Sequence, residues 1–158
     1  MHGTGDVEGT LPVEWYSTES AKSKKAFYAR ADVFINTLPL NNATKCFVDR
    51  QAFTDAKDDS VYVSIGRGDT TDQDALVEAL QAEQGPLKIG GASLDVTTPE
   101  PLPDGHLLWT LPNTIISPHC SGVSVHYFVL AVDLLKVNVE RLRGGKGGFN
   151  AWKGKGEE

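Results

Sequence analysis

Short apolar runs alternate along the chain with longer stretches in which apolar residues recur every three or four positions. The short runs have the composition of buried β-strands and cover residues 33–37, 61–65, 87–96 and 114–117. The longer stretches predict helices over residues 46–56, 73–82 and 122–142, with shorter helical pieces within residues 20–30 and near residues 107–109. Strands and helices that alternate in this way are typical of βαβ units. The pattern therefore predicts an α/β fold with a parallel sheet of about four strands and flanking helices.

The predicted helices have recognisable ends and faces. Thr71 or Asp72 can cap the helix over residues 73–82, because a short polar side chain accepts hydrogen bonds from the free N–H groups of a first helical turn. In the last helix, apolar residues are separated by alternating steps of four and three, so we expect one of its faces to be buried. These residues are Val123, Tyr127, Leu130, Leu134 and Val137.

Three segments follow from this pattern. Residues 1–30 are polar and rich in turn-forming residues, so we expect an irregular connecting segment with some helix near its end. Residues 31–143 hold the predicted strands and helices, and residues 144–158 form a glycine-rich tail that is flexible by composition. We expect the strand at residues 33–37 to have an unpaired edge, which would invite association or aggregation.

Composition and charge exclude several classes of protein. Of the 158 residues, 40% are hydrophobic and 23% are charged, which is ordinary for a globular domain in water. The net charge of −6 argues against nonspecific binding to nucleic acid or to anionic membranes. No apolar run is long enough to cross a bilayer, and the opening MHGTGDVEGT lacks the features of a signal peptide. We interpret Cys46 and Cys120 as reduced thiols of a cytoplasmic protein.

Candidate chemistry lies where the predicted strands end. Arg67 follows the strand at residues 61–65, Asp95 and Glu100 lie at and after the end of the third strand, and His119 follows the fourth. The carboxyl ends of parallel strands meet at one edge of a sheet, which is where α/β folds bind their ligands. A guanidinium can hold a carboxylate through two parallel hydrogen bonds, and an imidazole can transfer a proton near neutral pH. Read singly, each residue has a plainer structural explanation, such as a surface ion pair, a structural histidine or a solvated loop carboxylate.

Four sequence blocks together resemble the D-isomer-specific 2-hydroxyacid dehydrogenases, with the best local match to their glyoxylate/hydroxypyruvate reductase branch. The blocks are ADVFINTLPLNNAT, VSIGRGDTTDQDALVEAL, GASLDVTTPEPLP and TIISPHCSG. The resemblance implies a Rossmann-type domain of which residues 31–143 form the second half. The first βαβ half and its GxGxxG turn would be missing, because Gly3-Thr4-Gly5 lacks both the third glycine and a preceding strand.

The resemblance also implies a reaction and roles for individual residues. The reaction is hydride transfer between a nicotinamide and C2 of a small 2-hydroxy or 2-keto acid. Arg67 would orient the substrate, His119 would carry the proton, and Glu100 would favour the imidazolium form of His119. Contacts to NAD or NADP would come from the following residues: Leu38, Pro39, Thr44, Ile65, Gly66, Asp95, which would reach the nicotinamide carboxamide, and Gly122. We expect no metal site, because the adjacent His119 and Cys120 have no ligand spacing.

Two classes of function stay open at this point. The chain could be a fragment of such an oxidoreductase, acting on a glyoxylate- or hydroxypyruvate-type acid and inactive by itself. It could instead be a noncatalytic nucleotide-sensing or interaction module of the same fold, since such relatives can keep the same three polar residues. A homodimer is one option for its assembly, because relatives are commonly dimers.

Overall fold

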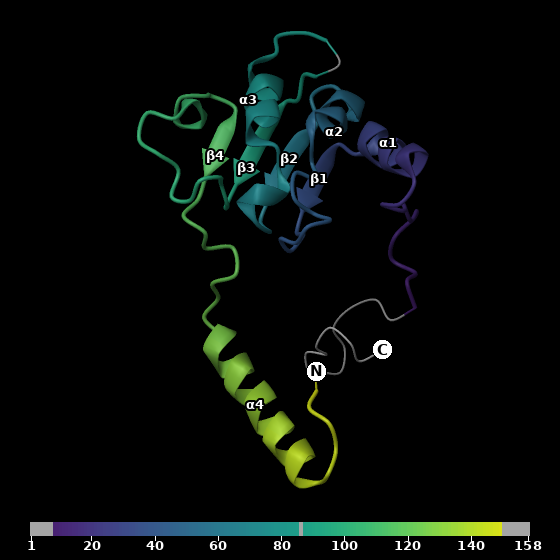
Figure 1. The fold of residues 1–158 in the computed structure, drawn as a ribbon, viewed down its shortest axis with the longest axis vertical. Coiled ribbons are helices and arrows are strands. Elements are labelled where there is room, and N and C mark those ends of the chain that lie inside the picture. Colours follow the sequence, from purple (N-terminus) through teal and green to yellow (C-terminus); the bar gives the residue numbers. More distant parts are fainter. Residues whose placement is uncertain (1–7, 86, 150–158) are drawn as a thin grey trace. The chain divides into compact units, whose positions relative to one another are not determined.

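The structure is a computed structural model that describes residues 8–85 and 87–149 (Figure 1). The chain divides into two units, residues 1–121 and residues 122–158. The first unit contains α1 (Ala21–Arg30), β1 (Val33–Asn36), α2 (Arg50–Asp55), β2 (Val61–Ser64), the 3₁₀ turn η1 (Gly68–Thr70), α3 (Gln73–Gln81), β3 (Gly91–Leu94), the 3₁₀ turn η2 (Leu107–Trp109) and β4 (Thr114–Ile116). The second unit contains α4 (Tyr127–Arg143).

The first unit is built on a four-stranded parallel sheet with the strand order β1-β2-β3-β4. The register aligns Val33 with Val61, Val61 with Gly91, and Ala92 with Thr114, so all four strands end at the same edge. This confirms the predicted α/β class and the parallel sheet. Within the described residues no strand pairs with the outer side of β1, so the expected open edge at this strand is also present.

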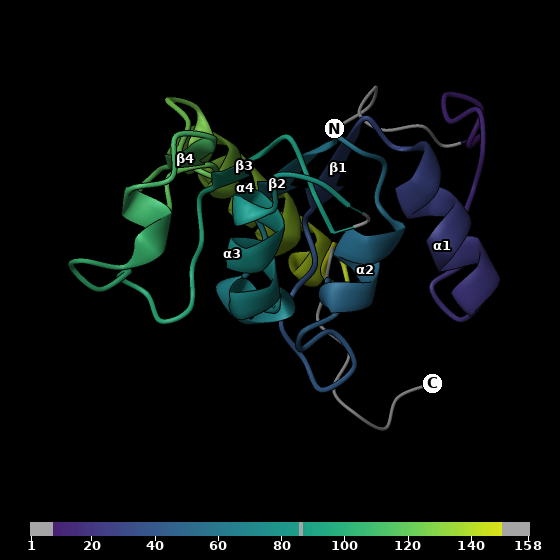
Figure 2. The same cartoon turned by 90° about the horizontal axis from the view of Figure 1, so that it is seen from above.

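The two faces of the sheet differ sharply in burial. Phe34, Tyr62 and Leu94 are buried in the core on the face that α2 and α3 cover (Figure 2). On the opposite face the apolar side chains of β1 and β4 reach water: Val33 is 53% exposed, Ile35 57% and Ile115 70%. One face of the sheet is therefore a packed core, and the other, here called the bare face, exposes the apolar side chains of its two outer strands.

Helices α2 and α3 each begin directly after an aspartate that caps their first turn. Asp72 caps α3 by accepting a hydrogen bond from the Ala75 N–H at 3.0 Å, as one of the two predicted caps. The helix predicted over residues 46–56 begins only at Arg50, because the Asp49 side chain caps it by accepting from the Ala52 N–H. The residues before this cap are not helical: Cys46 has a φ of +48°, and Val48 forms a β-bridge with Thr71.

The third strand is shorter than its apolar sequence suggests. The prediction covered residues 87–96, but β3 contains only Gly91–Leu94. Before the strand, the Ile89 N–H donates to the Ala79 carbonyl and the Gly90 N–H donates to the Ser60 carbonyl, so these residues anchor the connection to α3 and to the start of β2. The apolar residues 87 and 89 thus belong to a packed turn and not to the sheet.

The second unit corrects the expectation of a buried helix face. Helix α4 begins at Tyr127, later than the predicted start at residue 122, and none of its residues is buried. Among residues 122–149 the structure describes no second element on which α4 could pack, and its apolar positions are largely exposed. Among the helices of residues 8–85 and 87–149, none has both the length and the hydropathy needed to span a membrane. Residues 150–158 of the expected tail lie outside the described residues.

Candidate active site

The predicted polar residues follow the strands at the shared carboxyl edge of the sheet. The segments at this edge are residues 37–40 after β1, 65–67 after β2, 95–101 after β3 and 117–121 after β4. Because neighbouring strands are parallel and in register, successive segments lie next to one another. This edge is the place at which an α/β sheet can gather side chains for chemistry.

Glu100 and His119 form a direct pair. The Nδ1 atom of His119 lies 2.5 Å from Oε1 of Glu100, and both side chains are partly exposed. The pair lines a pocket of about 390 Å³ whose walls include Leu102, Trp109 and Ile116. Since Glu100 engages Nδ1, Nε2 is the ring nitrogen through which His119 can exchange a proton with a bound molecule.

Asp95 holds the turn that carries His119. Its Oδ1 accepts hydrogen bonds from the Ser117 hydroxyl at 2.5 Å and the Cys120 N–H at 2.9 Å, and its Oδ2 accepts from the Ser121 N–H at 2.8 Å. Between these anchor points His119 takes a left-handed conformation with φ of +51°. Asp95 is thus a buried clamp on the His119 turn, a use of its carboxylate that the sequence did not suggest.

The clamp determines the charge of Asp95. Burial acts to raise the pKa of the Asp95 carboxyl, but the hydrogen bonds from Ser117, Ser121 and Cys120 together outweigh burial and hold this pKa well below its usual range. Asp95 is therefore ionised in the folded protein at neutral pH. Its expected contact with the carboxamide of a nicotinamide stays a prediction.

We expect Asp95→Asn to change how stability depends on pH. The pKa of Asp95 is lower in the folded chain, so its contribution to stability is fully present above the ordinary carboxyl pKa of about 3.9 and is lost as the pH falls through the folded-state value. At pH 7 the variant should lose about 2 kcal/mol, because an amide cannot accept all three hydrogen bonds. Urea unfolding over a pH series should then show a shallower acid decline for the variant below about pH 4. Parallel curves for the two proteins would contradict the clamp.

Arg67 lines a separate pocket of about 390 Å³ on the β1–β2 side of the same edge, together with residues 37–40, Ile65 and Gly66. Arg67 is exposed, and its Nη1 donates to the Gly66 carbonyl at 2.7 Å. A Cβ at Gly66 would lie only 2.5 Å from the Leu38 carbonyl oxygen, so the turns after β1 and β2 can touch only with glycine there. The structure thus gathers Leu38, Pro39, Ile65, Gly66 and Arg67, while Glu100 and His119 line the other pocket.

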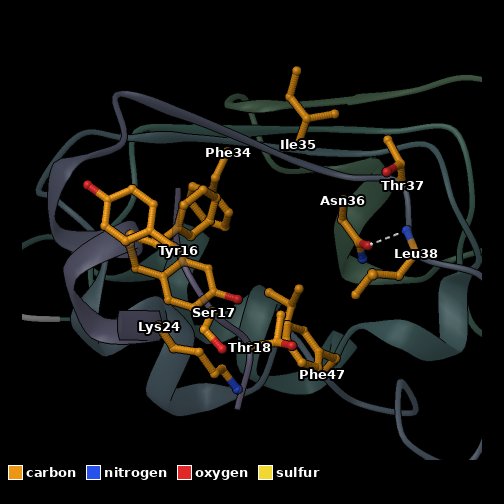
Figure 3. A pocket seen from close by; sticks show the side chains of 13 residues that line it. Tyr16, Ser17, Thr18, Lys24, Phe34, Ile35, Asn36, Thr37, Leu38 and Phe47 are labelled. Carbon is orange, nitrogen blue, oxygen red and sulfur yellow. Dashed lines mark hydrogen bonds between the residues drawn. The ribbon is translucent and has the colours of Figure 1, made fainter. Parts of the chain in front are cut away.

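Asn36, a residue that the sequence analysis did not single out, shapes the turn after β1. Its side-chain oxygen accepts from the Leu38 N–H at 3.0 Å beside a pocket of about 200 Å³ (Figure 3). Its amide nitrogen donates to the Tyr62 hydroxyl at 3.0 Å and to Thr70 Oγ1 at 2.8 Å. One buried amide therefore ties β1 to β2 and to η1. No local pattern signals this, because all the partners of its amide nitrogen are distant in sequence.

Two of the residues predicted to contact the cofactor, Thr44 and Gly122, line neither of the two pockets of about 390 Å³. The hydroxyl of Thr44 donates to the Pro39 carbonyl at 2.6 Å, so Thr44 closes the turn that carries Leu38 and Pro39. Gly122 is the first residue of the second unit, and open space surrounds the position that a Cβ would take there. The expected cofactor contacts of both residues stay predictions.

The family match and the similar proteins point to the same protein family. Residues 11–121 match the family described as D-isomer specific 2-hydroxyacid dehydrogenase, NAD binding domain. An uncharacterized protein from the proB 3′ region of Corynebacterium melassecola is 38% identical over 136 residues, covering 85% of this chain and 43% of that protein. The glyoxylate reductase/hydroxypyruvate reductase of Homo sapiens is 38% identical over 110 residues, covering 70% of this chain and 32% of that protein.

A solved structure agrees with the sequence relatives. The D-isomer specific 2-hydroxyacid dehydrogenase from Xanthobacter autotrophicus Py2, in complex with NADPH and MES, has a TM-score of 0.73 at 26% identity. The match covers 84% of this chain and 52% of that one, and the chain spans less than half the length of the two relatives named above. From the family match over residues 11–121, the chain belongs to the D-isomer specific 2-hydroxyacid dehydrogenases and carries sequence of their NAD-binding domain.

Proposed function

We propose that this chain provides the proton-transferring part of an NAD(P)-dependent oxidoreductase that acts on a small 2-hydroxy or 2-keto acid of the glyoxylate or hydroxypyruvate type. One observation carries the proposal: the Glu100–His119 pair at 2.5 Å, set in a pocket at the carboxyl edge of the sheet. The human relative is named a glyoxylate reductase/hydroxypyruvate reductase, which supports this class of substrate.

The residues present fit one end of the cofactor. The pocket between residues 37–40 and 65–67 is lined by Arg67, and its two walls approach each other closely at Gly66 and Leu38. Such a pocket at the strand ends suits the nicotinamide end of NAD or NADP. Within the described residues no strand is followed by a complete GxGxxG turn and a helix, the pattern that binds the pyrophosphate in this type of fold; Gly66 and Gly68 after β2 lack the third glycine. When bound, the cofactor supplies or accepts the hydride.

The chain's own residues would bind the acid and move the proton. The Arg67 guanidinium binds the substrate carboxylate and so fixes the direction of the neighbouring carbonyl. In the reducing direction His119 donates its Nε2 proton to the carbonyl oxygen, which becomes the hydroxyl of the product. Glu100 engages Nδ1 and so leaves Nε2 as the ring nitrogen that exchanges the proton. In the oxidising direction the neutral imidazole accepts the hydroxyl proton.

A two-part assay tests the proposal. The 158 residues alone should show no steady oxidation of NADH or NADPH with glyoxylate or hydroxypyruvate, because the sequence lacks a pyrophosphate-binding turn. A chimaera in which residues 11–121 replace the matching part of the human relative should reduce at least one of these acids. A folded chimaera that binds NAD(P)H but reduces neither acid would contradict the proposed function. Turnover by the 158 residues alone would contradict the need for further sequence.

A second candidate is a noncatalytic interaction module, and the bare apolar face of the sheet favours it. Val33, Ile35 and Ile115 are each more than half exposed, and such faces often mark contacts with another polypeptide. Association through this face is compatible with either function, including a homodimer. The chimaera separates the two candidates, because a purely interacting module gives no turnover when its pocket is completed.

A further inference from the structure

The first residue of α3 reaches across to the loop that carries Glu100. The side-chain oxygen of Gln73 accepts a hydrogen bond from the Thr98 N–H at 2.8 Å, and its Nε2 donates to the Thr98 carbonyl at 2.6 Å. A side-chain amide that pairs with both polar groups of one residue fixes the direction as well as the position of the backbone there. Gln73 and Thr98 are both partly buried.

A second contact joins the same two loops. A Cβ at Gly68 would lie 2.0 Å from the Thr97 carbonyl oxygen and 2.7 Å from Thr98 Oγ1, so Gly68 packs directly against the backbone of Thr97 and the side chain of Thr98. Gly68 follows Arg67 immediately. The segment that carries Arg67 and the segment that leads to Glu100 therefore lie against each other with no space for a side chain between them.

The loop itself has few backbone donors. Pro99 and Pro101 have no N–H, so between Thr98 and Leu102 only Thr98, Glu100 and Leu102 can donate a backbone hydrogen bond. The Thr98 N–H and carbonyl are both held by Gln73. The partly exposed Glu100 side chain follows two residues later and meets His119. The Glu100 carboxylate is thus carried by a short segment that Gln73 holds at Thr98, that the Thr97 hydroxyl holds at the Pro99 carbonyl at 3.1 Å, and that ends at the buried Leu102.

We propose that Gln73 is a positioning residue that holds the Glu100 carboxylate against His119; the catalytic meaning of this role rests on the proposed function. Gln73 touches neither Glu100 nor His119 in the contacts of the described residues and acts through Thr98. Without it, residues 98–101 gain freedom, and the Glu100–His119 hydrogen bond forms only part of the time.

NMR of the 15N-labelled 158-residue chain tests the proposal without cofactor or substrate. Gln73→Met keeps the volume of the side chain but removes both hydrogen bonds to Thr98. We expect the Thr98 amide to exchange with solvent at least about tenfold faster. We also expect the resonance of the His119 Nδ1 proton to lose the downfield shift that a short bond to a carboxylate produces. Gln51→Met is the matched control, since Gln51 donates to Asp55 within α2, away from the loop, and should change neither signal.

A second variant keeps the test decisive if Gln73→Met fails to fold. Gln73→Glu retains an acceptor for the Thr98 N–H and places an acidic group in the first turn of α3, where it favours the helix. It replaces the donor to the Thr98 carbonyl by an oxygen that repels this carbonyl. The resonance of the His119 Nδ1 proton should therefore lose its downfield shift, as in Gln73→Met. The circular dichroism spectrum of the chain should not change. If the signals of Thr98 and His119 are unchanged in a folded Gln73 variant, the positioning role is wrong. An inert chimaera with these NMR changes present would contradict the proposed function alone.

Discussion

Replacing His119 by alanine in the chimaera should lower kcat/KM for glyoxylate or hydroxypyruvate by about a thousandfold, within the range that general acid–base catalysis contributes. The variant removes the one group in the pocket of Glu100 that can both donate and accept a proton near neutral pH. Water can replace this donor only poorly, because water is a weaker acid than a protonated imidazole and Glu100 does not hold it in place. Most of the loss should therefore appear in kcat.

Steady-state kinetics combined with cofactor binding checks this expectation. NAD(P)H fluorescence should give the same dissociation constant for the chimaera and its His119→Ala variant, since His119 lines a different pocket from residues 37–40 and 65–67. Glu100→Gln is a second, milder variant, because it keeps an acceptor for Nδ1 but removes the negative charge. Its decrease in kcat/KM should be smaller than that of His119→Ala. A His119→Ala chimaera that keeps its rate would remove His119 from the reaction.

Arg67→Gln should raise KM for the acid substrate by about a hundredfold, because a neutral amide replaces a two-point hydrogen bond between opposite charges. Arg67 is exposed and contacts only the Gly66 carbonyl through its guanidinium in the described residues, so its charge is available to a ligand. The free energy of unfolding should barely change for the same reason. The predicted effect is thus on binding and not on stability.

Two comparisons make the Arg67 experiment specific. Arg50→Gln is the matched control, because Arg50 pairs with Glu78 on the surface of the helix layer, where an ion pair contributes little. A substrate without a carboxylate, such as methylglyoxal, should be reduced slowly by the chimaera and equally slowly by its Arg67→Gln variant. If Arg67→Gln impairs both substrates to the same extent, Arg67 does not bind the carboxylate.

The sequence predicted the strands well where β-forming residues were flanked by clear stops. The run at residues 114–117 ends at Pro118, and β4 ends at Ile116. Prediction failed where a polar contact overrode an apolar pattern: Asp49 starts α2 at Arg50 although Phe47 and Val48 suggested an earlier start. The burial predicted for α4 failed for a different reason, because periodicity shows that a helix has an apolar face but not what covers it.

The candidate site was also predicted only in part. Glu100 and His119 could be paired from the resemblance, and the structure brings them together. The roles of Asp95 as a clamp and of Gln73 as a tie to Thr98 could not be foreseen, because their partners lie more than twenty residues away in sequence. Such contacts depend on the register of β2, β3 and β4, which fixes which loops meet. A single sequence contains no local signal for that register.

The bare face of the sheet has a practical consequence for work with the purified chain. Dyes such as ANS fluoresce when they bind apolar surface, and their fluorescence is commonly taken as a sign of a molten state. Here Val33, Ile35 and Ile115 offer such surface in the ordered fold. A bright dye signal at room temperature would therefore accompany correct folding, and melting curves are better recorded by far-ultraviolet circular dichroism than by dye fluorescence.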